Sequence, residues 1–449
     1  MKTQKFFAVM LCSAAFAVIV AACSGKKSSE SSQALVTPGL SAPVTLNVID
    51  SYLPNLTEPD VIALNIMIDR FTLAHPDITL VRDQSSADVI DTKVPTLASA
   101  NELPDIFTNR SAWVPNFEAS GQLMSINDLF ADDSAFLAGF SPGMLDDFTY
   151  QGKAYGIPWR AMSLFFMYYN MDILSQAGVT SVPRTYDELK AAITAVKKIG
   201  VTPIALGDKG KWCSRMWFSG LNVRTAGGDY LERLKSGQLK FTDTTIKNSL
   251  DIMKELADMG AFNEDFTAID FLQARQLYYA KKTAMYGEMA AFAQSSETAW
   301  PDDIRAVTKF EFFPALSGEG PVSGNVAEPV TADWGLSFNS KLQGDKLVAA
   351  RAFAKEVLGN EYNQVLAEKG GIAVRPTPSA NFSQLPSAVV YYNENIAPRI
   401  IGGGHIDSRL PGGVLETVSA ALQETLLGMK QPAAALQDMQ NALDRADIK

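Results

Sequence analysis

The chain alternates short apolar runs with amphipathic helical stretches, and this alternation limits the folds open to it. Val44–Asp50 (VTLNVID) reads as a buried strand, and a helix opens at Thr57-Glu58-Pro59, where proline suits a first turn. Apolar residues then recur on one helical face until His75-Pro76, where the proline disfavours further helix. Ile78–Val81 (ITLV) follows as a second strand. Because strand, helix and strand succeed one another, the pattern predicts a βαβ unit and a parallel sheet.

The same alternation continues through the rest of the chain. Leu164–Tyr169 (LFFMYY) is typical of a buried strand, and Thr185 with Glu188 matches a capping box before an amphipathic helix that Gly200 ends. Further strand patterns lie at 103–107 and 202–206, and helix patterns at 88–100, 244–259, 346–358, 414–427 and 433–446. With 449 residues the chain is long enough for two α/β lobes, in which ligands bind beyond the carboxyl ends of strands.

The start of the chain reads as an export signal rather than as part of the fold. Lys2 and Lys5 form a basic region in front of an apolar stretch, Phe6–Ala22. Val20-Ala21-Ala22-Cys23 resembles the bacterial lipobox, in which the cysteine is lipidated and becomes the mature N-terminus. An uncleaved anchor is the alternative, because the apolar stretch is nearly long enough to span a bilayer. The Ser-rich residues that follow Cys23 are expected to form a flexible tether.

The charge balance and the cysteine and histidine counts exclude several classes of function. The formal net charge is −10, so the chain lacks the basic footprint of a nucleic-acid-binding protein. With Cys12 in the signal and Cys23 carrying lipid, Cys213 is the one thiol left, and no internal disulfide is expected. His75 and His405 are the only histidines, so a transition-metal site built on histidine is not expected. The fold must therefore be stabilised by its hydrophobic cores.

Several segments, taken in order, resemble one protein family. They are HPDITL at 75–80, LPDIF at 103–107, GKAYGIP at 152–158, YYNMDIL at 168–174, TYDEL at 185–189, ADWGLSFNSK at 332–341 and GGIAVRPTP at 370–378. On these segments the chain is identified as a member of the bacterial extracellular solute-binding proteins (family 1, sugar-binding), the lipoprotein receptor component of ABC importers. The resemblance covers the chain from about Val44 to its end. It departs from the family pattern after Ala284-Met285, where Tyr286-Gly287-Glu288-Met289 lacks a frequent tryptophan.

The resemblance implies an α/β, two-lobed periplasmic-binding-protein-like fold, with a ligand cleft between the lobes and several hinge crossings. The expected divisions are a lipoprotein signal peptide at 1–22, a Ser-rich tether at 23–43, lobe 1 at 44–155 plus about 328–374, and lobe 2 at 156–327 plus about 375–449. The segment GKAYGIPWR at 152–160 would then form the first hinge crossing.

The resemblance also implies a function. The chain would be a lipid-anchored extracytoplasmic receptor at the cell membrane, periplasmic or on the outer face. It would bind a sugar, expected to be an oligosaccharide, by lobe closure and deliver it to an ABC transporter permease. It would be a monomer without catalytic residues, cofactor or metal, held at the membrane through lipidated Cys23.

Two alternatives stay open: an exported carbohydrate-active enzyme and a ligand sensor on the same fold. A glycoside hydrolase would need two opposed carboxylates, and the 49 acidic residues leave room for such a pair. The sequence contains no nucleophile elbow, HExxH motif or P-loop.

A sugar receptor needs flat aromatic surface for the C–H faces of the ring and charged or amide groups for its hydroxyls. The resemblance places a stacking aromatic at Trp334, with Asp333 beside it as a hydroxyl acceptor, and a ligand contact at Arg375. Core packing, a solvated carboxylate and a lobe–lobe salt bridge are the respective alternatives. Trp159 and Arg160 follow the expected crossing, where they either touch the ligand or pack the crossover.

The remaining candidates lie in loops that follow predicted strands. They are Tyr52, Arg110, Trp113, Trp212, Trp217 and Glu288. One of Trp212 and Trp217 is expected to line the cleft, and Cys213 between them is expected to be a small buried residue. Arg110 would form a fork to a hydroxyl pair or a carboxylate, with simple surface exposure as the alternative.

Overall fold

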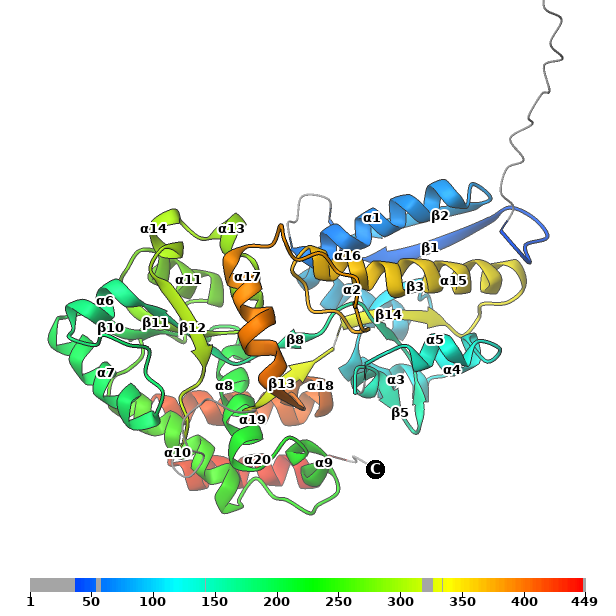
Figure 1. Cartoon of the computed structure of the whole chain (residues 1–449). Helices are drawn as coiled ribbons and strands as arrows, with labels where there is room; N and C mark the ends of the chain where they lie inside the picture. The colour runs from blue at the N-terminus through cyan, green and yellow to red at the C-terminus, as the bar shows by residue number, and fades with distance from the viewer. Residues whose placement is uncertain (1–36, 54–57, 142, 317–325, 333, 447–449) are drawn as a thin grey trace, which may run out of the picture. The chain divides into compact units, whose positions relative to one another are not determined.

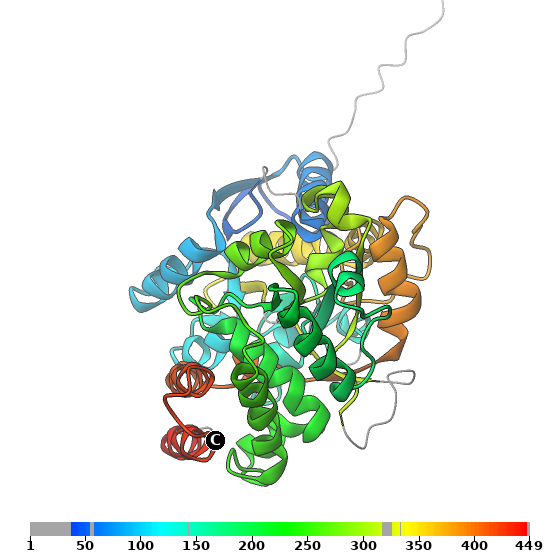
Figure 2. The same ribbon diagram turned by 90° about the vertical axis from the view of Figure 1, so that its left-hand side faces the viewer.

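A computed structural model describes residues 37–53, 58–141, 143–316, 326–332 and 334–446 (Figures 1 and 2). The expected signal peptide at 1–22, the lipidation site Cys23 and the candidate Asp333 lie outside these residues. In the part of the chain that is described, no helix has the length and apolar character needed to cross a membrane.

Residues 37–43, the end of the expected tether, contact the first lobe. The buried Thr37 hydroxyl donates to Asp77 at 2.8 Å and lies 2.6 Å from Nδ1 of His75. The Ser41 hydroxyl donates to Asp345 at 2.8 Å. The folded part of the chain therefore begins before Val44, because these polar contacts hold the preceding turn against the domain.

The first sheet contains the βαβ unit that the sequence predicts. β1 (Val44–Asp50) pairs in parallel with β2 (Ile78–Gln84) and with β3 (Ile106–Arg110), and α1 (Pro59–Ala74) connects β1 to β2. The strand order is β2-β1-β3-β14-β4, where β4 is Leu123–Met124, and β14 (Trp334–Asn339) is antiparallel to both β3 and β4. The sheet is therefore mixed, with a parallel half that places the ends of β1 and β3 at one edge.

The third strand starts later than the sequence predicts. The pattern indicates a strand at 103–107, whereas β3 covers Ile106–Arg110. Pro104 has no N–H to give to the sheet, and the side-chain amide of Asn339 donates to the carbonyls of Leu103 (2.6 Å) and Pro104 (3.3 Å). This side-chain bonding replaces strand pairing before Ile106.

Three helices cover the first sheet together with α1. α2 (Ala87–Ser99) contacts β3, α15 (Gly344–Val357) contacts β1 and α1, and α16 (Asn360–Glu368) contacts α1 and α15. Their apolar faces share one buried core with the strands, which includes Leu46, Phe71, Ile106, Leu336 and Phe353. Segments that lie almost 300 residues apart in sequence thus build one lobe.

The second sheet has the order β10-β11-β9-β12. β10 (Thr202–Ala205) is parallel to β11 (Thr283–Glu288), while β9 (Phe166–Asn170) is antiparallel to both β11 and β12 (Thr308–Phe312). The apolar run predicted as a strand at 164–169 is thus confirmed as β9, shifted by two residues at its start. Its side chains are buried on both faces, which explains why it lacks polar alternation.

The predicted capping box is confirmed at the start of α7 (Tyr186–Lys198). The Thr185 hydroxyl accepts the backbone N–H of Glu188 at 3.2 Å, and the Glu188 carboxylate accepts the backbone N–H of Thr185 at 3.3 Å. After the helix, Gly200 has φ +77°, a left-handed conformation that glycine adopts without strain.

Four helices pack beside the second sheet: α8 (Trp212–Thr225), α10 (Thr244–Asp258), α19 (Gly412–Leu426) and α20 (Pro432–Arg445). α19 and α20, in red, lie side by side in both views (Figures 1 and 2). Their apolar faces join the second core, which confirms the amphipathic pattern predicted for the end of the chain.

A three-stranded sheet lies where the chain passes between the two cores. β13 (Val326–Thr331) is antiparallel to β8 (Met162–Ser163) and parallel to β15 (Ile400–Gly403). The first core extends to Ala161 and the second begins at Leu164, and Met162 packs against both. We therefore propose that the first crossing lies at 162–163, later than the expected boundary after residue 155.

The segment 152–160 belongs to the first lobe. Gln151 (φ 48°) and Gly152 (φ 79°) form the turn between β5 (Thr149–Tyr150) and β6 (Lys153–Ala154). β7 (Ile157–Pro158) then pairs with β14, so the chain runs along the first sheet before it crosses. The mixture of loose and stiff residues thus builds a hairpin and an added strand.

Candidate ligand-binding site

Strand topology gathers five of the predicted site residues at one edge of the first sheet. β1 and β3 are parallel, so Tyr52 and Arg110 lie at neighbouring carboxyl ends. β14 runs the other way and begins at this edge, with Trp334 opposite Arg110. β7 ends beside it, because Pro158 pairs with Gly335, and this places Trp159 and Arg160 next in line.

Three of these side chains form an aromatic cluster. The Trp159 ring meets Tyr52 edge-on at 5.1 Å and lies 6.1 Å from the Trp334 ring at an interplanar angle of 45°. The guanidinium carbon of Arg110 lies 3.9 Å from the centre of the Trp334 ring, within cation–π range. Tyr52 and Trp159 are almost fully buried and Trp334 is 9% exposed.

Asp60, which the sequence reading missed, connects this cluster to α1. It stands in the first turn of α1, and its buried carboxylate accepts the indole N–H of Trp159 at 3.2 Å. The same carboxylate accepts from the Arg160 guanidinium at 3.1 Å. A carboxylate at a helix N-terminus is further stabilised by the helix dipole, so Asp60 fixes both side chains.

Arg110 is held by a second carboxylate. Its Nε and Nη2 both donate to Asp91 of α2 at 2.6 Å, a bidentate pair of the kind that fixes a guanidinium in one orientation. Side chains of the pair are about one-third exposed, and those of Arg160 and Asp60 are 28% and 7% exposed. The guanidinium groups of Arg110 and Arg160 are therefore held in position while part of each side chain stays exposed to solvent.

The Tyr52 hydroxyl is buried without a hydrogen-bond partner among the described residues. Burial raises the pKa of Tyr52 well above its usual value, and the neighbouring Asp50 raises it further. The phenol therefore stays neutral, and its ring packs against Trp159.

The second sheet presents its own polar edge. β10 and β11 are parallel, so Asp208, which follows β10, and Glu288, which ends β11, lie at the same end of the sheet. The buried Glu288 carboxylate accepts two bonds from Arg275, both at 2.7 Å. Asp208 accepts the N–H of Ser214 at 2.8 Å, and burial raises its pKa.

A further arginine–carboxylate pair lies in the second lobe, close to Arg110 of the first lobe. Arg215 of α8 donates to Asp407 at 2.6 and 2.7 Å, and Asp407 lies on α18 (Ile406–Arg409). Burial alone would raise the pKa of Asp407, but His405, Arg215 and the first-lobe Arg110 together lower it. The Ser111 hydroxyl donates to the carbonyl of Ser408 at 3.4 Å. Arg110 and α18 therefore belong to one polar neighbourhood.

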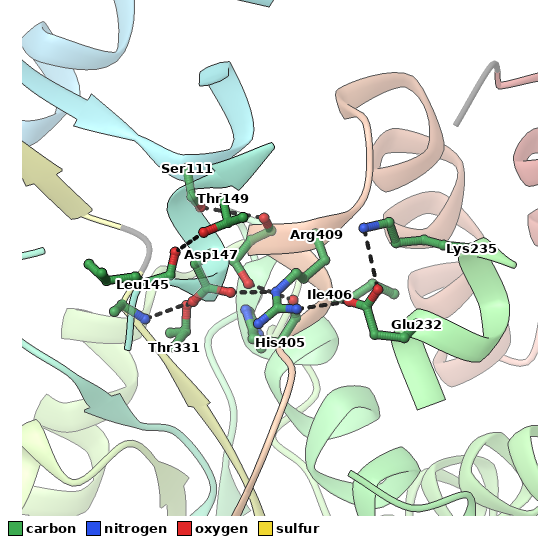
Figure 3. A network of polar contacts seen from close by, with 12 residues as sticks. Ser111, Leu145, Asp147, Thr149, Glu232, Lys235, Thr331, His405, Ile406 and Arg409 are labelled. Carbon is green, nitrogen blue, oxygen red and sulfur yellow. Dashed lines mark hydrogen bonds and ion pairs between the residues drawn. The ribbon is translucent and has the colours of Figure 1, made fainter. Parts of the chain in front are cut away.

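An ion network of four residues is centred on Arg409, the last residue of α18, and includes Lys235, whose Nζ lies 3.7 Å from Glu232 (Figure 3). Arg409 donates to Asp147 at 2.5 Å and to Glu232 at 2.8 Å. Asp147 is buried and also accepts the Thr331 hydroxyl (3.0 Å) and the Ala332 N–H (2.8 Å). Because Thr331 ends β13, the network ties first-lobe, crossing and second-lobe segments together.

His405, next to this network, makes stability depend on pH. It is buried, and its Nε2 has no hydrogen-bond partner among the described residues. Burial lowers its pKa and Arg215 lowers it further, against the opposing effect of Asp407 and Asp147. Below about pH 6.5, the His405 side chain therefore binds a proton in the unfolded chain but not in the folded chain. Acidification thus lowers the free energy of unfolding.

We expect the His405→Asn variant to lose part of this pH dependence. In urea titrations, the free energy of unfolding of the unmodified chain should fall more steeply between about pH 6.5 and pH 5.5 than that of the variant. Equal slopes for the two proteins would contradict a buried neutral histidine at this position.

The remaining predicted residues lie elsewhere. Trp217 is buried in the second core between Phe165 (5.2 Å) and Phe262 (5.5 Å), and its ring covers Gly287 so closely that a Cβ there would clash. Trp212 is partly exposed, with its ring 5.3 Å from Phe271. Cys213 between them is buried, as predicted.

Arg375 and Trp113 both lie in the first lobe. The Arg375 guanidinium carbon stands 4.2 Å from the Phe136 ring and 3.8 Å from the Phe140 ring, and its Nη2 donates to the Phe136 carbonyl at 2.8 Å. Burial lowers its pKa to about 10. Trp113 is partly buried, 6.0 Å from the Phe117 ring, in the turn that contacts α18.

Metal ligation has no support in the part of the chain that the structure describes, since no group of three His, Cys, Asp or Glu side chains is arranged to hold an ion. The carboxylates at the two strand edges pair with arginines instead, as described for Asp60, Asp91 and Glu288. The arrangement is suited to hydrogen bonding with a polar ligand beside aromatic surface.

Comparison with known proteins identifies the class. Residues 54–364 match the sequence model of the bacterial extracellular solute-binding protein family. Because the match covers well over half of the chain, the protein belongs to this family, and the sequence-based identification is confirmed. Its fold is the two-lobed α/β periplasmic-binding fold.

Curated relatives match over shorter stretches. An uncharacterised ABC transporter extracellular-binding protein of Pyrococcus horikoshii is 25% identical over 229 residues, 50% of this chain and 51% of the relative. An osmoprotective compounds-binding protein of Synechocystis is 24% identical over 38% of this chain and 41% of that relative. The chain thus matches about half the length of these proteins or less.

Solved structures match over nearly the whole chain. A chitin oligosaccharide binding protein gives a TM-score of 0.76 at 23% identity, covering 90% of this chain and 98% of its own. A maltose-bound protein from T. maritima gives 0.69 at 17% identity, covering 89% and 99%. At these identities the likeness establishes the fold.

Proposed function

We propose that this chain is a lipid-anchored extracytoplasmic receptor. It binds a sugar, in particular an oligosaccharide, by closure of its two lobes and delivers it to an ABC transporter permease. The family membership supports the receptor role and its place outside the cytoplasm. The chitin oligosaccharide and maltose binding proteins that share the fold support a sugar as the ligand class.

The observation that carries the proposal is the pairing of arginines with carboxylates beside aromatic rings at the first strand edge. Arg160 with Asp60, and Arg110 with Asp91, each offer donors and acceptors a few ångströms apart. Neighbouring hydroxyls of a sugar donate and accept together, so such charge-assisted pairs suit them. Trp334 and Trp159 supply the apolar surface behind them.

The predicted residues receive distinct roles in this proposal. Arg160 and Arg110 contact hydroxyls, and the Trp334 ring with Arg110 stacked on it forms one wall. Tyr52 and Trp159 position them from behind. Trp113 is a further candidate on the first-lobe side, and Trp212 and the Glu288–Arg275 pair are candidates on the opposing side. Asp333, next to Trp334, stays a candidate outside the described residues. Trp217 and Arg375 stabilise the cores of their lobes.

A binding role fits these carboxylates better than hydrolysis does. A glycoside hydrolase uses one of its two carboxyl groups as a proton donor, whereas a carboxylate that binds an arginine already has its oxygens engaged as hydrogen-bond acceptors. Asp60, Asp91 and Glu288 each contact an arginine. Incubation with the bound glycan should therefore return it intact, and chromatographic detection of shorter products would favour the enzyme.

The ligand class is tested by thermal shift with chito-, xylo- and malto-oligosaccharides, set against amino acids, peptides and polyamines. A ligand that binds only the folded chain raises the melting temperature through mass action. We expect a shift with at least one oligosaccharide. A shift with only a peptide, an amino acid or a polyamine would refute the sugar proposal.

A matched pair of variants on α1 tests the site. Asp60→Asn keeps the shape of the side chain and removes the charge that Arg160 pairs with, and we expect it to weaken sugar binding by about tenfold or more, or about 1.4 kcal/mol. Asp69→Asn makes the same change at an exposed position of the same helix and should leave affinity unaltered. Equal affinities in calorimetric titrations of the two variants would exclude the Asp60 neighbourhood from the site.

Membrane attachment is tested separately. We expect the unmodified protein to fractionate with membranes and the Cys23→Ser variant to lose its lipid and this attachment. Membrane retention of the variant would instead favour the uncleaved apolar anchor.

A further inference from the structure

A pocket of about 520 Å³ lies within the second lobe, apart from the strand edges described above. Its walls come from the loop before α7, from Trp300 and the end of α14 (Asp302–Arg305), from β12, and from α17 (Ser387–Tyr391). Figure 1 shows α17 in orange beside β12. The volume lies in the range typical of small-molecule sites. Because all walls belong to one lobe, occupation of this pocket does not require lobe closure.

Aromatic side chains supply the apolar part of the lining. The Tyr391 ring meets Phe310 of β12 edge-on at 5.3 Å, and Tyr391 is 39% exposed. Trp300 and Phe310 are themselves almost fully buried and hold this wall in place. A partly exposed tyrosine over a rigid aromatic base gives a ring-shaped ligand a surface to pack against.

The charged part of the lining is positive. Glu311 accepts from Arg399 at 3.1 and 3.2 Å, so its charge is already balanced. Arg305 pairs with Asp302. Arg184 and Lys309 also line the pocket, both are exposed, and neither has an ion-pair partner among the described residues.

Arg184 lies close enough to Tyr391 for its positive charge to affect the pKa of the phenol. Burial raises the pKa of Tyr391 and Glu311 raises it further, while Arg399 and Arg184 lower it. A cation, a phenol and an aromatic surface therefore border the same space. This positive pocket is also unusual against the formal net charge of −10 for the whole chain.

We propose that this pocket is a second ligand site, which binds a small organic carboxylate that carries a six-membered ring. Arg184 and Lys309 bind the carboxylate through charge-assisted hydrogen bonds, and the ring packs against Tyr391. Thr180, Ser181 and Ser387 add hydroxyl groups to the lining. The site is separate from the proposed sugar site, so we expect each site to bind its own ligand independently of the other.

Two acids distinguish the sources of such a ligand. D-Glucuronate carries a sugar ring and 4-hydroxybenzoate an aromatic ring, and D-glucose and 4-hydroxybenzyl alcohol are their neutral counterparts. Titration of the chain, followed by calorimetry or ligand-observed NMR, should show that at least one acid binds at least about tenfold more tightly than its counterpart. Failure of both acids to bind, or equal binding of acid and neutral counterpart, would overturn the proposal.

Variants assign the binding to this pocket. Arg184→Met with Lys309→Met should weaken binding of the acid at least about tenfold, and Ala388→Trp should block the space. Arg70→Met, at an exposed arginine of the first lobe, is the matched control and should bind as the unmodified chain does. Unchanged binding of the acid in both the Arg184/Lys309 and Ala388 variants would refute the site. Retained oligosaccharide binding in the same variants would leave the sugar proposal unaffected by that result.

Discussion

Replacing Trp334 by alanine is expected to abolish measurable sugar binding and to lower the free energy of unfolding. The change removes the ring that the Arg110 guanidinium covers at 3.9 Å and that packs 6.1 Å from Trp159. Removing a largely buried tryptophan costs about 3–5 kcal/mol. Calorimetric titration with the best oligosaccharide and denaturation in urea would measure the two effects.

The Trp334→Phe variant separates binding from folding. It keeps an aromatic ring beside Arg110, so we expect it to retain part of the affinity and most of the stability. If Trp334→Ala folds, with a native far-UV spectrum, and binds with unchanged affinity, Trp334 is a core residue only. That result would remove the aromatic wall from the proposed site.

Replacing Arg409 by methionine is the second change with a large expected effect. The apolar stem is retained, but the buried Asp147 carboxylate loses its charged partner and keeps only Thr331 and Ala332 as donors. Breaking one side of a buried ion pair costs about 3–5 kcal/mol, because the remaining charge is left in a poorly solvated place. We expect the free energy of unfolding in urea to fall by about this amount.

Two further variants in the same network act as controls (Figure 3). Glu232 is 55% exposed, so Glu232→Gln should cost less than about 1 kcal/mol. Adding Asp147→Asn to Arg409→Met should recover part of the loss, since the unpaired charge is gone. If Arg409→Met costs no more than Glu232→Gln, the network does not stabilise the crossing.

Most of the fold follows from local patterns in the sequence. The spacing of apolar residues and the turn residues predict the βαβ unit, the capping box of α7 and the terminal helix pair. The later start of β3 is different, because it depends on Asn339, more than 200 residues away, bonding to the carbonyls before Ile106. The later crossing that we propose has the same origin, since Trp159 packs with Tyr52 of the loop after the first strand.

The candidate site was predictable only in part, for a related reason. Positions after predicted strands indicated Tyr52 and Arg110, because parallel topology brings such positions to one edge, and the family resemblance indicated Trp334. Asp60 gave no local signal beyond its place in a helix first turn, since its partners Trp159 and Arg160 lie about 100 residues further along the chain. An acidic residue in the first turn of the helix that follows the first strand is the one sign that could have suggested it.

The residue types tryptophan and arginine do not by themselves predict whether the side chain is exposed. The prediction that Trp212 and Trp217 lie in a loop is wrong, because both lie on α8, whose helical repeat directs Trp217 into the aromatic core. Arg375 is buried against two phenylalanine rings and a carbonyl, a placement that its sequence neighbours do not reveal. Partners distant in sequence decided both cases.

The proposal that a sugar binds at the first strand edge is tested by a crystal structure of the chain with the oligosaccharide that raises its melting temperature most. We expect a sugar ring in contact with the Trp334–Arg110 wall, with hydroxyls bonded to Arg160 or Arg110 and the two lobes closed on it. Oligosaccharide bound only in the second-lobe pocket beside Tyr391, with the first strand edge vacant, would contradict it.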